Sequence, residues 1–328
     1  MFNNKSILLT GGTGSFGQEA CKELLLNYSP KKIIVFSRDE LKQYEMAKIF
    51  TDNKFRFFIG DIRDKDRLLM AMRGVDVVIH AAAMKQVEIS EYNPFECIKT
   101  NINGAQNIIE AAIFCKVKKV IALSSDKAVS PLNLYGATKL ASEKLFIAAN
   151  NIAAGKTIFS VVRYGNVSES RGSVIPIFKN IIKNKSNYLP ITNLKMTRFF
   201  ILLNDGAKFV LNSLKIMKGG EIFIPKLKSF RISDLAKALA PKKKIKVVGI
   251  RPGEKIHEIL FSEDESRFII EFKKYFVIPP LINLTKKKNF YFYLSNDKGK
   301  KIIEKEYSSE INNFLNINEI KKILNVNN

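Results

Sequence analysis

The sequence has no tryptophan, two histidines and three cysteines in 328 residues. The spacing of Cys21, Cys97 and Cys115 contains no C-x-x-C, so we expect buried reduced thiols rather than disulfides or a zinc site. His80 and His257 are too few and too far apart to indicate a metal, and we expect His80 to be a hydrogen-bonded core residue. No apolar run approaches the roughly 20 residues that span a bilayer, and no signal peptide is evident. We therefore predict a cytoplasmic protein with no membrane partner and no metal.

Acidic residues are also scarce. The chain has 31 Asp and Glu against 54 Lys and Arg, which gives a formal charge of +23. Such a balance can indicate nucleic-acid binding. However, the lysines form short scattered clusters, as at 242–244 and 298–301, and no RNP motif, zinc motif or arginine-rich tract accompanies them. We predict no nucleic-acid partner, and we expect the positive field to attract an anionic substrate.

Nearly half of the residues are apolar (46%), so the chain can bury a full core. Strand and helix patterns alternate through the first half. We expect strands at 5–10, 32–36, 55–59, 76–80, 120–124 and 157–162, and helices at 15–27, from 39, at 94–114 and at 134–149. Such alternation predicts an α/β fold, a doubly wound parallel Rossmann sheet that binds ligands at the carboxyl ends of its strands.

The alternation breaks after residue 165, and the sheet pattern returns only briefly around 206–214 and 221–225. We predict two interlocked domains without a clean linker. A Rossmann domain comprises residues 1–165 and 201–228, and a smaller α/β substrate domain comprises residues 166–200 and 229–328.

A glycine-rich loop lies between the first predicted strand and the first predicted helix, and its residues are Gly11, Gly12, Thr13, Gly14, Ser15, Phe16 and Gly17. In this context Gly11 allows a tight turn, and Gly14 lets the backbone approach a pyrophosphate at the helix N-terminus. Gly17 lets the helix pack closely on the strand. The loop therefore predicts a dinucleotide cofactor.

The end of the second strand distinguishes NAD from NADP. An acid there binds the free ribose 2′-hydroxyl of NAD, whereas an arginine accommodates the 2′-phosphate of NADP. This chain has Ser37 and Arg38, with Lys42 one helical turn later, although Asp39 is an acid beside them. The pattern favours NADP over NAD. Further cofactor contacts are expected after the later strands, at Asp61, Ile62, Ala81, Ala82, Lys85 and Tyr164.

A tyrosine and a lysine four residues apart, Tyr135 and Lys139, share one face of a predicted helix. A phenol has a pKa of about 10 and is a poor base at neutral pH. A nearby ammonium favours the phenolate and lowers that pKa, so the pair can remove an alcohol proton as a hydride leaves carbon. Ser125 would hydrogen-bond the same hydroxyl.

With these motifs, the whole chain resembles the extended short-chain dehydrogenase/reductase superfamily. Within it, the chain is most similar to the short UDP-N-acetylglucosamine 4,6-dehydratases that invert C5, the first enzymes of the pseudaminic acid pathway. The matching segments occur in order at 10–17, 80–85, 91–96, 99–106, 124–139, 163–167, 196–201 and 251–259. Ser125 stands where threonine is common, and residues 86–88 replace a more usual His-Val-Pro.

The resemblance implies a 4,6-dehydration without net redox change. C4 is oxidised, C5 loses a proton, the 6-hydroxyl leaves, and the hydride returns to C6. The product would be UDP-2-acetamido-2,6-dideoxy-β-L-arabino-hex-4-ulose. Ordinary sugar dehydratases carry Asp-Glu where this chain has Asp126 and Lys127. Asp126 would be the acid for C6, and Lys127 the C5 base if burial or nearby cations lower its pKa.

The resemblance also suggests how the UDP-sugar is held. Arg198 and Arg251 are candidates for the diphosphate, because a guanidinium matches phosphate oxygens. Glu254 could accept from a ribose hydroxyl. Lys85, Asn166 and Val167 complete the predicted substrate site. The family further implies a homo-oligomer, dimer or hexamer, and a role in flagellin glycosylation.

Other functions are compatible with parts of this pattern. A UDP-sugar C4 epimerase needs Tyr135 and Lys139 but not the Asp126–Lys127 pair, and it loses no water. C5-retaining dehydratases of the family commonly carry methionine at the position of Tyr135 and have transmembrane helices. A non-catalytic NADP-binding regulator would tolerate the loss of Tyr135. A basic nucleic-acid-binding protein would show a salt-dependent gel shift.

Overall fold

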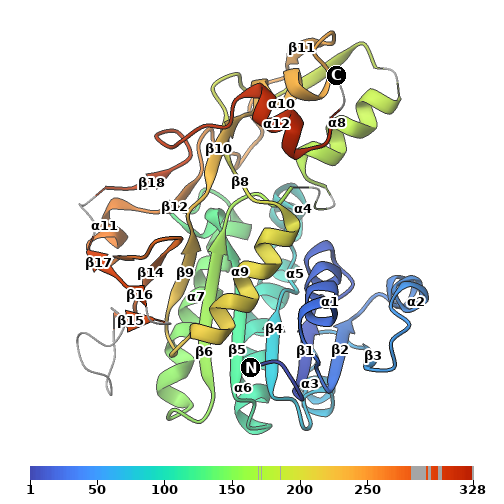
Figure 1. The fold of residues 1–328 in the computed structure, drawn as a ribbon, viewed down its shortest axis with the longest axis vertical. Coiled ribbons are helices and arrows are strands. Elements are labelled where there is room, and N and C mark those ends of the chain that lie inside the picture. Colours follow the sequence, from blue (N-terminus) through green and yellow to red (C-terminus); the bar gives the residue numbers. More distant parts are fainter. Residues whose placement is uncertain are drawn as a thin grey trace.

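The computed structural model describes residues 1–168, 170, 172–184, 186–281, 293–294, 297–301 and 305–326. A ten-stranded sheet crosses the molecule in the order β17-β13-β14-β9-β6-β5-β4-β1-β2-β3 (Figure 1). Its strands are β1 (Ser6–Thr10), β2 (Lys32–Ser37), β3 (Phe55–Ile59), β4 (Val77–His80), β5 (Lys119–Ser125), β6 (Ile158–Tyr164), β9 (Ile222–Pro225), β13 (Ile270–Glu271), β14 (Tyr275–Ile278) and β17 (Lys300–Lys301). The pairs from β3 to β9 are parallel, whereas β14, β13 and β17 add antiparallel.

Helices cover both faces of this sheet. They are α1 (Ser15–Asn27), α2 (Glu40–Ile49), α3 (Lys65–Ala71), α4 (Val87–Tyr92), α5 (Pro94–Ile98), α6 (Gly104–Phe114), α7 (Leu134–Ile152) and α9 (Leu203–Ile216). A π-helical turn (Lys99–Asn103) joins α5 to α6, and a 3-10 turn (Asp126–Ala128) follows β5.

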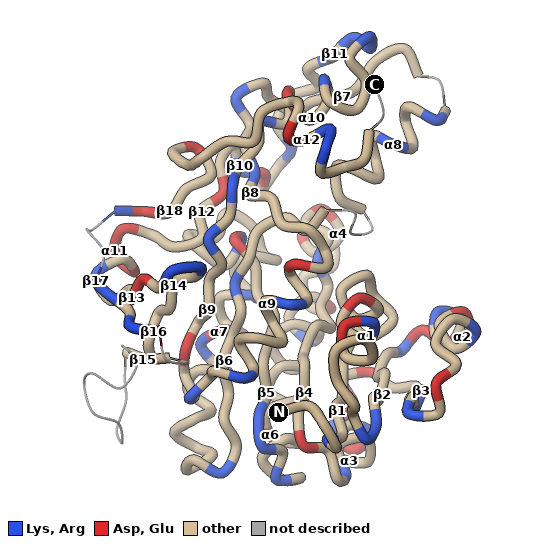
Figure 2. Tube along the Cα trace, in the orientation of Figure 1, with Lys and Arg blue, Asp and Glu red and all other residues tan. Residues whose placement is uncertain are grey.

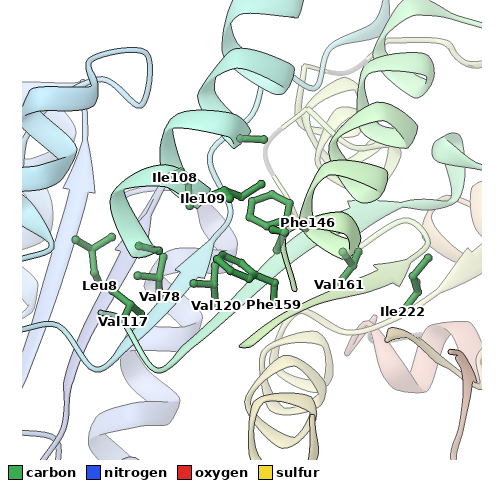
Figure 3. Packing of buried hydrophobic residues seen from close by; sticks show 14 of the residues in the cluster. Leu8, Val78, Ile108, Ile109, Val117, Val120, Phe146, Phe159, Val161 and Ile222 are labelled. Atoms are coloured by element: carbon green, nitrogen blue, oxygen red, sulfur yellow. The ribbon is translucent and has the colours of Figure 1, made fainter. Parts of the chain in front are cut away.

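Two hydrophobic clusters lie on the opposite faces of the sheet. In one, Val78 and Val120 of the strands contact Ile108 of α6 and Phe146 of α7 (Figure 3). In the other, α1 and α9 pack together against the second face. The central strands are buried on both faces, which is why their sequences are almost continuously apolar.

A second region with its own core lies beyond the carboxyl ends of the parallel strands (Figure 1). It contains α8 (Val174–Lys183), β7 (Tyr188–Ile191), β8 (Thr197–Phe200), β10 (Lys228–Arg231), α10 (Ile232–Leu239), β11 (Lys244–Val247) and α12 (Ile317–Ile323). Beside it run β12 (Ile259–Phe261), α11 (Glu263–Ser266) and β18 (Tyr307–Ser308), and a short hairpin comprises β15 (Tyr293–Leu294) and β16 (Asp297–Lys298).

The Rossmann sheet is confirmed, and the predicted bounds of its six strands agree with the observed ones within two residues. The domain division differs from the observed sheet in one respect. Residues 229–328 are predicted to belong to the substrate domain, whereas β13, β14 and β17 extend the large sheet because they continue the pairing from β9. The helix predicted at 94–114 is interrupted by the π-helical turn.

Lysine and arginine positions are distributed over the whole trace and interspersed with acidic ones (Figure 2). In the part of the chain that the structure describes, no helix is long and apolar enough to span a membrane.

Candidate active site

One cleft of about 1270 Å³ opens at the carboxyl ends of the parallel strands, between the sheet and the second region. Every residue that the sequence assigns to the cofactor, to catalysis or to the substrate lines this cleft. The residues come from elements far apart in the chain, from the loop after β1 to the segment before β12. Their individual roles remain predictions, but the structure places all of them around one space.

The glycine loop has the form that a pyrophosphate requires. Gly11 has φ +65°, and a Cβ there would lie 2.9 Å from the backbone of Ala82. A Cβ on Gly17 would lie 2.4 Å from the carbonyl oxygen of Gly12, so only glycine lets α1 approach β1 this closely. The N-cap of α1 is Gly14, which has no side chain to cover the helix N-terminus. The loop therefore fits a dinucleotide diphosphate.

The acid next to Arg38 has a structural role. Asp39 is the N-cap of α2, where its carboxylate accepts from the backbone N–H of Lys42 at 3.0 Å and pairs with the Lys42 ammonium. Arg38 is exposed at the rim, with Nη1 3.7 Å from Oδ2 of Asp61. Burial acts to raise the pKa of Asp61, but hydrogen bonds and charge from Arg63, with the charge of Arg38, lower it below its usual value.

The catalytic side chains meet where β5 ends and α7 begins. Ser125 is the last residue of β5, its Oγ donates to Oδ1 of Asp126 at 2.8 Å, and it acts to lower the pKa of Tyr135. The N-cap of α7 is Asn133, which places Tyr135 and Lys139 on the first turns of that helix. The predicted constellation thus shares one hydrogen-bonded site.

The electrostatics of Tyr135 differ from the sequence prediction. Burial raises the pKa of Tyr135 to about 12, although the Lys127 ammonium and the hydrogen bond with Ser125 act to lower it. The ammonium of Lys139 instead donates to the carbonyl oxygen of Leu123 at 2.6 Å. Burial lowers the pKa of Lys139 to about 8. The predicted lowering of the phenol pKa is therefore wrong, because desolvation outweighs the cations.

Lys127 lies between two buried carboxylates. Its Nζ is 3.1 Å from Oδ1 of Asp126 and 2.8 Å from Oε1 of Glu258, and both carboxylates are 1% exposed. Burial acts to lower the pKa of Lys127, but the two negative charges raise it above its usual value. The condition stated for Lys127 as the C5 base, a lowered pKa, is therefore not met. Burial, and then the charge of Glu258, raise the pKa of Asp126, as an acid for C6 would require.

Glu258 and Lys255 are cleft residues that sequence reasoning missed. The only available signal was their place in the matching segment 251–259. Burial acts to raise the pKa of Glu258, but Lys127, Arg198 and Lys255 lower it. Burial lowers the pKa of Lys255, whose Nζ donates to the carbonyl oxygen of Val129 at 2.6 Å.

The two arginines predicted for the diphosphate have different surroundings. Arg198 is 6% exposed and donates to three backbone carbonyl oxygens, those of Thr197, Lys255 and Ile256. It therefore also fixes the 251–259 segment against β8. Arg251 is exposed, with Nη1 3.3 Å from Oε1 of Glu88.

Six cleft residues carry a buried oxygen with no hydrogen-bond partner among the described residues: Thr100 Oγ1, Ser124 Oγ, Asp126 Oδ2, Asn166 Oδ1, Ser173 Oγ and Glu258 Oε2. Such orphaned acceptors are rare in folded proteins and indicate a polar ligand. His80 is a buried core residue whose Nδ1 lies 2.8 Å from Oγ1 of Thr10, as predicted. The described residues contain no cluster of three or more His, Cys, Asp or Glu that could hold a metal.

Comparison with known proteins gives a consistent result. Residues 7–280 match the model of a family described as "Polysaccharide biosynthesis protein". The UDP-N-acetylglucosamine 4,6-dehydratase (inverting) of Campylobacter jejuni is 59% identical over 315 residues, which is 95% of this chain and 94% of that protein. The UDP-glucose 4-epimerase of Rickettsia bellii is 43% identical, over 99% of this chain and 96% of that protein.

Solved structures agree on the fold. The X-ray structure of Pen from Bacillus thuringiensis aligns with a TM-score of 0.90 at 40% identity, over 99% of this chain and 98% of that one. The dTDP-glucose 4,6-dehydratase DesIV from Streptomyces venezuelae, solved with NAD and TYD, aligns with a TM-score of 0.70 at 21% identity, over 78% of this chain and 87% of that one. At that identity the second likeness concerns the fold alone.

Proposed function

The chain belongs to this polysaccharide biosynthesis protein family, and from that premise we propose that it is an inverting UDP-N-acetylglucosamine 4,6-dehydratase. The observation that carries the proposal is the pair formed by the buried Asp126 and the half-buried Lys127, in the cleft that also contains Ser125, Tyr135 and the glycine loop. The 59% identity to an enzyme of that name supports it.

The side chains divide the reaction between two ends of the site. Tyr135 and Ser125 contact the 4-hydroxyl, and Tyr135 takes its proton during oxidation as the phenolate. Burial opposes that ionised form, whereas the Lys127 ammonium and Ser125 favour it. The resulting C4 ketone acidifies the proton on C5. Asp126, whose pKa burial raises, protonates the 6-hydroxyl as it leaves as water. Lys127 lies beside Asp126, where it can serve C5.

The loop geometry fits a nicotinamide dinucleotide, and we assign it as NADP. When bound, this cofactor supplies the acceptor for the C4 hydride and the donor that returns it to C6. Gly11, Gly14 and the N-terminus of α1 would hold its diphosphate. The choice of NADP rests on Arg38 at the rim, where it can meet a 2′-phosphate, and on the commitment of Asp39 to the α2 cap.

A UDP-sugar C4 epimerase is the second candidate, since the Rickettsia relative carries that name. An epimerase needs Tyr135 and a dinucleotide but has no use for a protonated Asp126 beside Lys127. Inversion at C5 is part of our proposal. We further predict a homo-oligomer, a cytoplasmic location and a role in pseudaminic acid synthesis for flagellin.

The decisive experiment is incubation with UDP-N-acetylglucosamine in heavy water, followed by NMR of the product. We expect a C6 methyl group, solvent deuterium at C5 and an arabino ring. A gluco–galacto mixture with an intact C6 hydroxymethyl would identify an epimerase. A deuterated product of unchanged C5 configuration would identify a retaining dehydratase, and unchanged substrate would refute both dehydratase assignments.

A further inference from the structure

Glu258 has no role in the scheme above, although it is among the most enclosed charged groups of the cleft. Its Oε1 accepts from the Lys127 ammonium at 2.8 Å, and its Oε2 is buried without a partner among the described residues. The backbone N–H of Glu258 donates to Oγ of Ser309 at 2.9 Å, and its carbonyl oxygen accepts from the N–H of Ser309 at 2.8 Å. The carboxylate is therefore held rigidly against Lys127.

Lys127 cannot act as a base while it carries its third proton. The amine has to lose a proton before it can accept one from C5, and the acceptor must lie within hydrogen-bond distance. Two carboxylates meet that condition, Asp126 and Glu258. Asp126 has to be protonated already, because it is the acid for C6. Of these two described carboxylates only Glu258 can then take the proton, and it does so against the stabilisation that the ion pair gives to both charged forms.

We propose that Glu258 is a positioning residue that holds the Lys127 proton, so that the amine of Lys127 can remove the C5 proton. This inference rests on the proposed dehydratase function. It also explains the state of Asp126, because the negative charge of Glu258 nearby favours the neutral acid there.

The proton steps balance. The N–H bond of Lys127 breaks and an O–H bond forms on Glu258, which leaves a neutral amine. The C5–H bond then breaks, its proton joins the amine, and its electron pair becomes the enolate of the C4 ketone. The C6–O bond breaks as that pair forms a C5=C6 double bond, and Asp126 protonates the departing oxygen to give water. After hydride return to C6, C5 takes a proton from water on the face opposite Lys127, which inverts C5. The amine of Lys127 keeps the proton that it took from C5, and Glu258 releases its proton to water.

One proton remains to be moved, because Tyr135 has gained one from the 4-hydroxyl and Asp126 has lost one. Ser125 acts on both groups: its Oγ donates to Oδ1 of Asp126 at 2.8 Å, and it is among the groups that lower the pKa of Tyr135. A proton transfer through Ser125 restores both residues. The enzyme therefore returns to its starting state with water as the outside acid at C5 and the outside base at Glu258.

The test uses the full-length variant Glu258→Gln, whose amide keeps the shape but cannot hold the proton. In a single turnover with bound NADP and UDP-N-acetylglucosamine, we expect reduced nicotinamide to accumulate, because C4 oxidation does not need Glu258. Formation of the 6-deoxy product and deuterium entry at C5 should fall at least ~100-fold, within the range of general acid–base contributions. Glu258→Asp should recover part of the loss.

The matched control is Glu263→Gln, an exposed glutamate on α11 outside the cleft, which should leave the product rate unchanged. Two results would overturn the inference while the proposed function stands. One is a dehydration rate of Glu258→Gln within threefold of that of wild type. The other is the loss of nicotinamide reduction together with dehydration in this variant, which would indicate a merely structural role. Should Glu258→Gln not fold, a Glu258→Asp variant as active as wild type would overturn it as well. Absence of dehydration by the wild type itself would refute both proposals.

Discussion

Replacing Arg163 by methionine should destabilise the protein severely, because it removes the guanidinium from a closed ion network. Arg163 lies on β6 and is 0% exposed. Its Nε and Nη2 donate to Glu143 of α7 at 3.0 and 2.6 Å, and its Nη1 and Nη2 donate to Glu265 of α11 at 2.9 and 3.0 Å. Nη1 also donates to the carbonyl oxygen of Leu260 at 2.9 Å. The network joins the sheet to the helix that carries Tyr135.

The magnitude follows from what the substitution leaves behind. Glu143 is 1% exposed and would keep a buried charge without a partner, whereas Glu265 is 24% exposed and can turn to solvent. Removing one partner of a buried ion pair costs about 3–5 kcal/mol. In the double variant Arg163→Met/Glu143→Gln the orphaned charge is absent, so we expect about 1–3 kcal/mol of that loss to be recovered.

Urea unfolding followed by far-ultraviolet circular dichroism measures these changes. Lys65→Met is a suitable control, because Lys65 pairs with Glu110 at the exposed surface. Such pairs contribute about 0–1 kcal/mol. The reasoning would be refuted if Arg163→Met lost no more free energy of unfolding than Lys65→Met, or if the double variant were less stable than the single one.

Three further outcomes follow from the site. Arg38→Ala should weaken NADP binding at least ~10-fold, about 1.4 kcal/mol, and leave NAD binding almost unchanged in calorimetric titration; equal losses would contradict the 2′-phosphate assignment. Lys127→Ala should reduce nicotinamide but form no 6-deoxy sugar, and full activity would exclude Lys127 as the C5 base. Lys139→Met should abolish hydride transfer yet stabilise the fold at pH 7, because burial lowers the pKa of Lys139 from 10.5 to about 8. The unfolded chain binds this proton more tightly than the folded protein does. The buried charge of Lys139 therefore lowers the free energy of unfolding of wild type by its full amount below pH 8, and this loss disappears as the pH rises toward 10.5. At about 1.4 kcal/mol per pKa unit, less the hydrogen bond to Leu123, the gain is about 2 kcal/mol; urea titrations at pH 7 and 10 that gave the same difference would contradict it.

Local patterns were sufficient to predict the cofactor half of the site. The strand–glycine loop–helix unit is contiguous in sequence, and parallel strands place their carboxyl ends at one edge, so residues after β1, β2 and β5 had to meet. The helix bounds of α1 agree with the prediction for the same reason: its apolar period and its glycine start are both local.

The remainder of the site depends on contacts between distant segments. Glu258 lies 131 residues after Lys127, and it reaches the cleft because β12 pairs with β18 near the C-terminus. No rule based on the spacing of residues in the sequence predicts that pairing. The predicted pKa direction of Tyr135 was wrong, and the lowered pKa that Lys127 would need as a base is not met, for a related reason. Burial and a second carboxylate are properties of the packed site rather than of the motif.

The buried cluster itself favours a dehydratase over an epimerase. Placing Asp126, Lys127 and Glu258 together away from water costs desolvation energy that the ion pairs only partly offset, and apolar side chains of similar volume would be at least as stable. Two of its carboxylate oxygens also lack partners among the described residues, which adds to that cost. A C4 epimerase has only to return a hydride to the other face of the ketone and gains nothing from such a group. A reaction that must deprotonate C5 and expel the 6-hydroxyl needs a held acid and a base together, and that need accounts for the cluster.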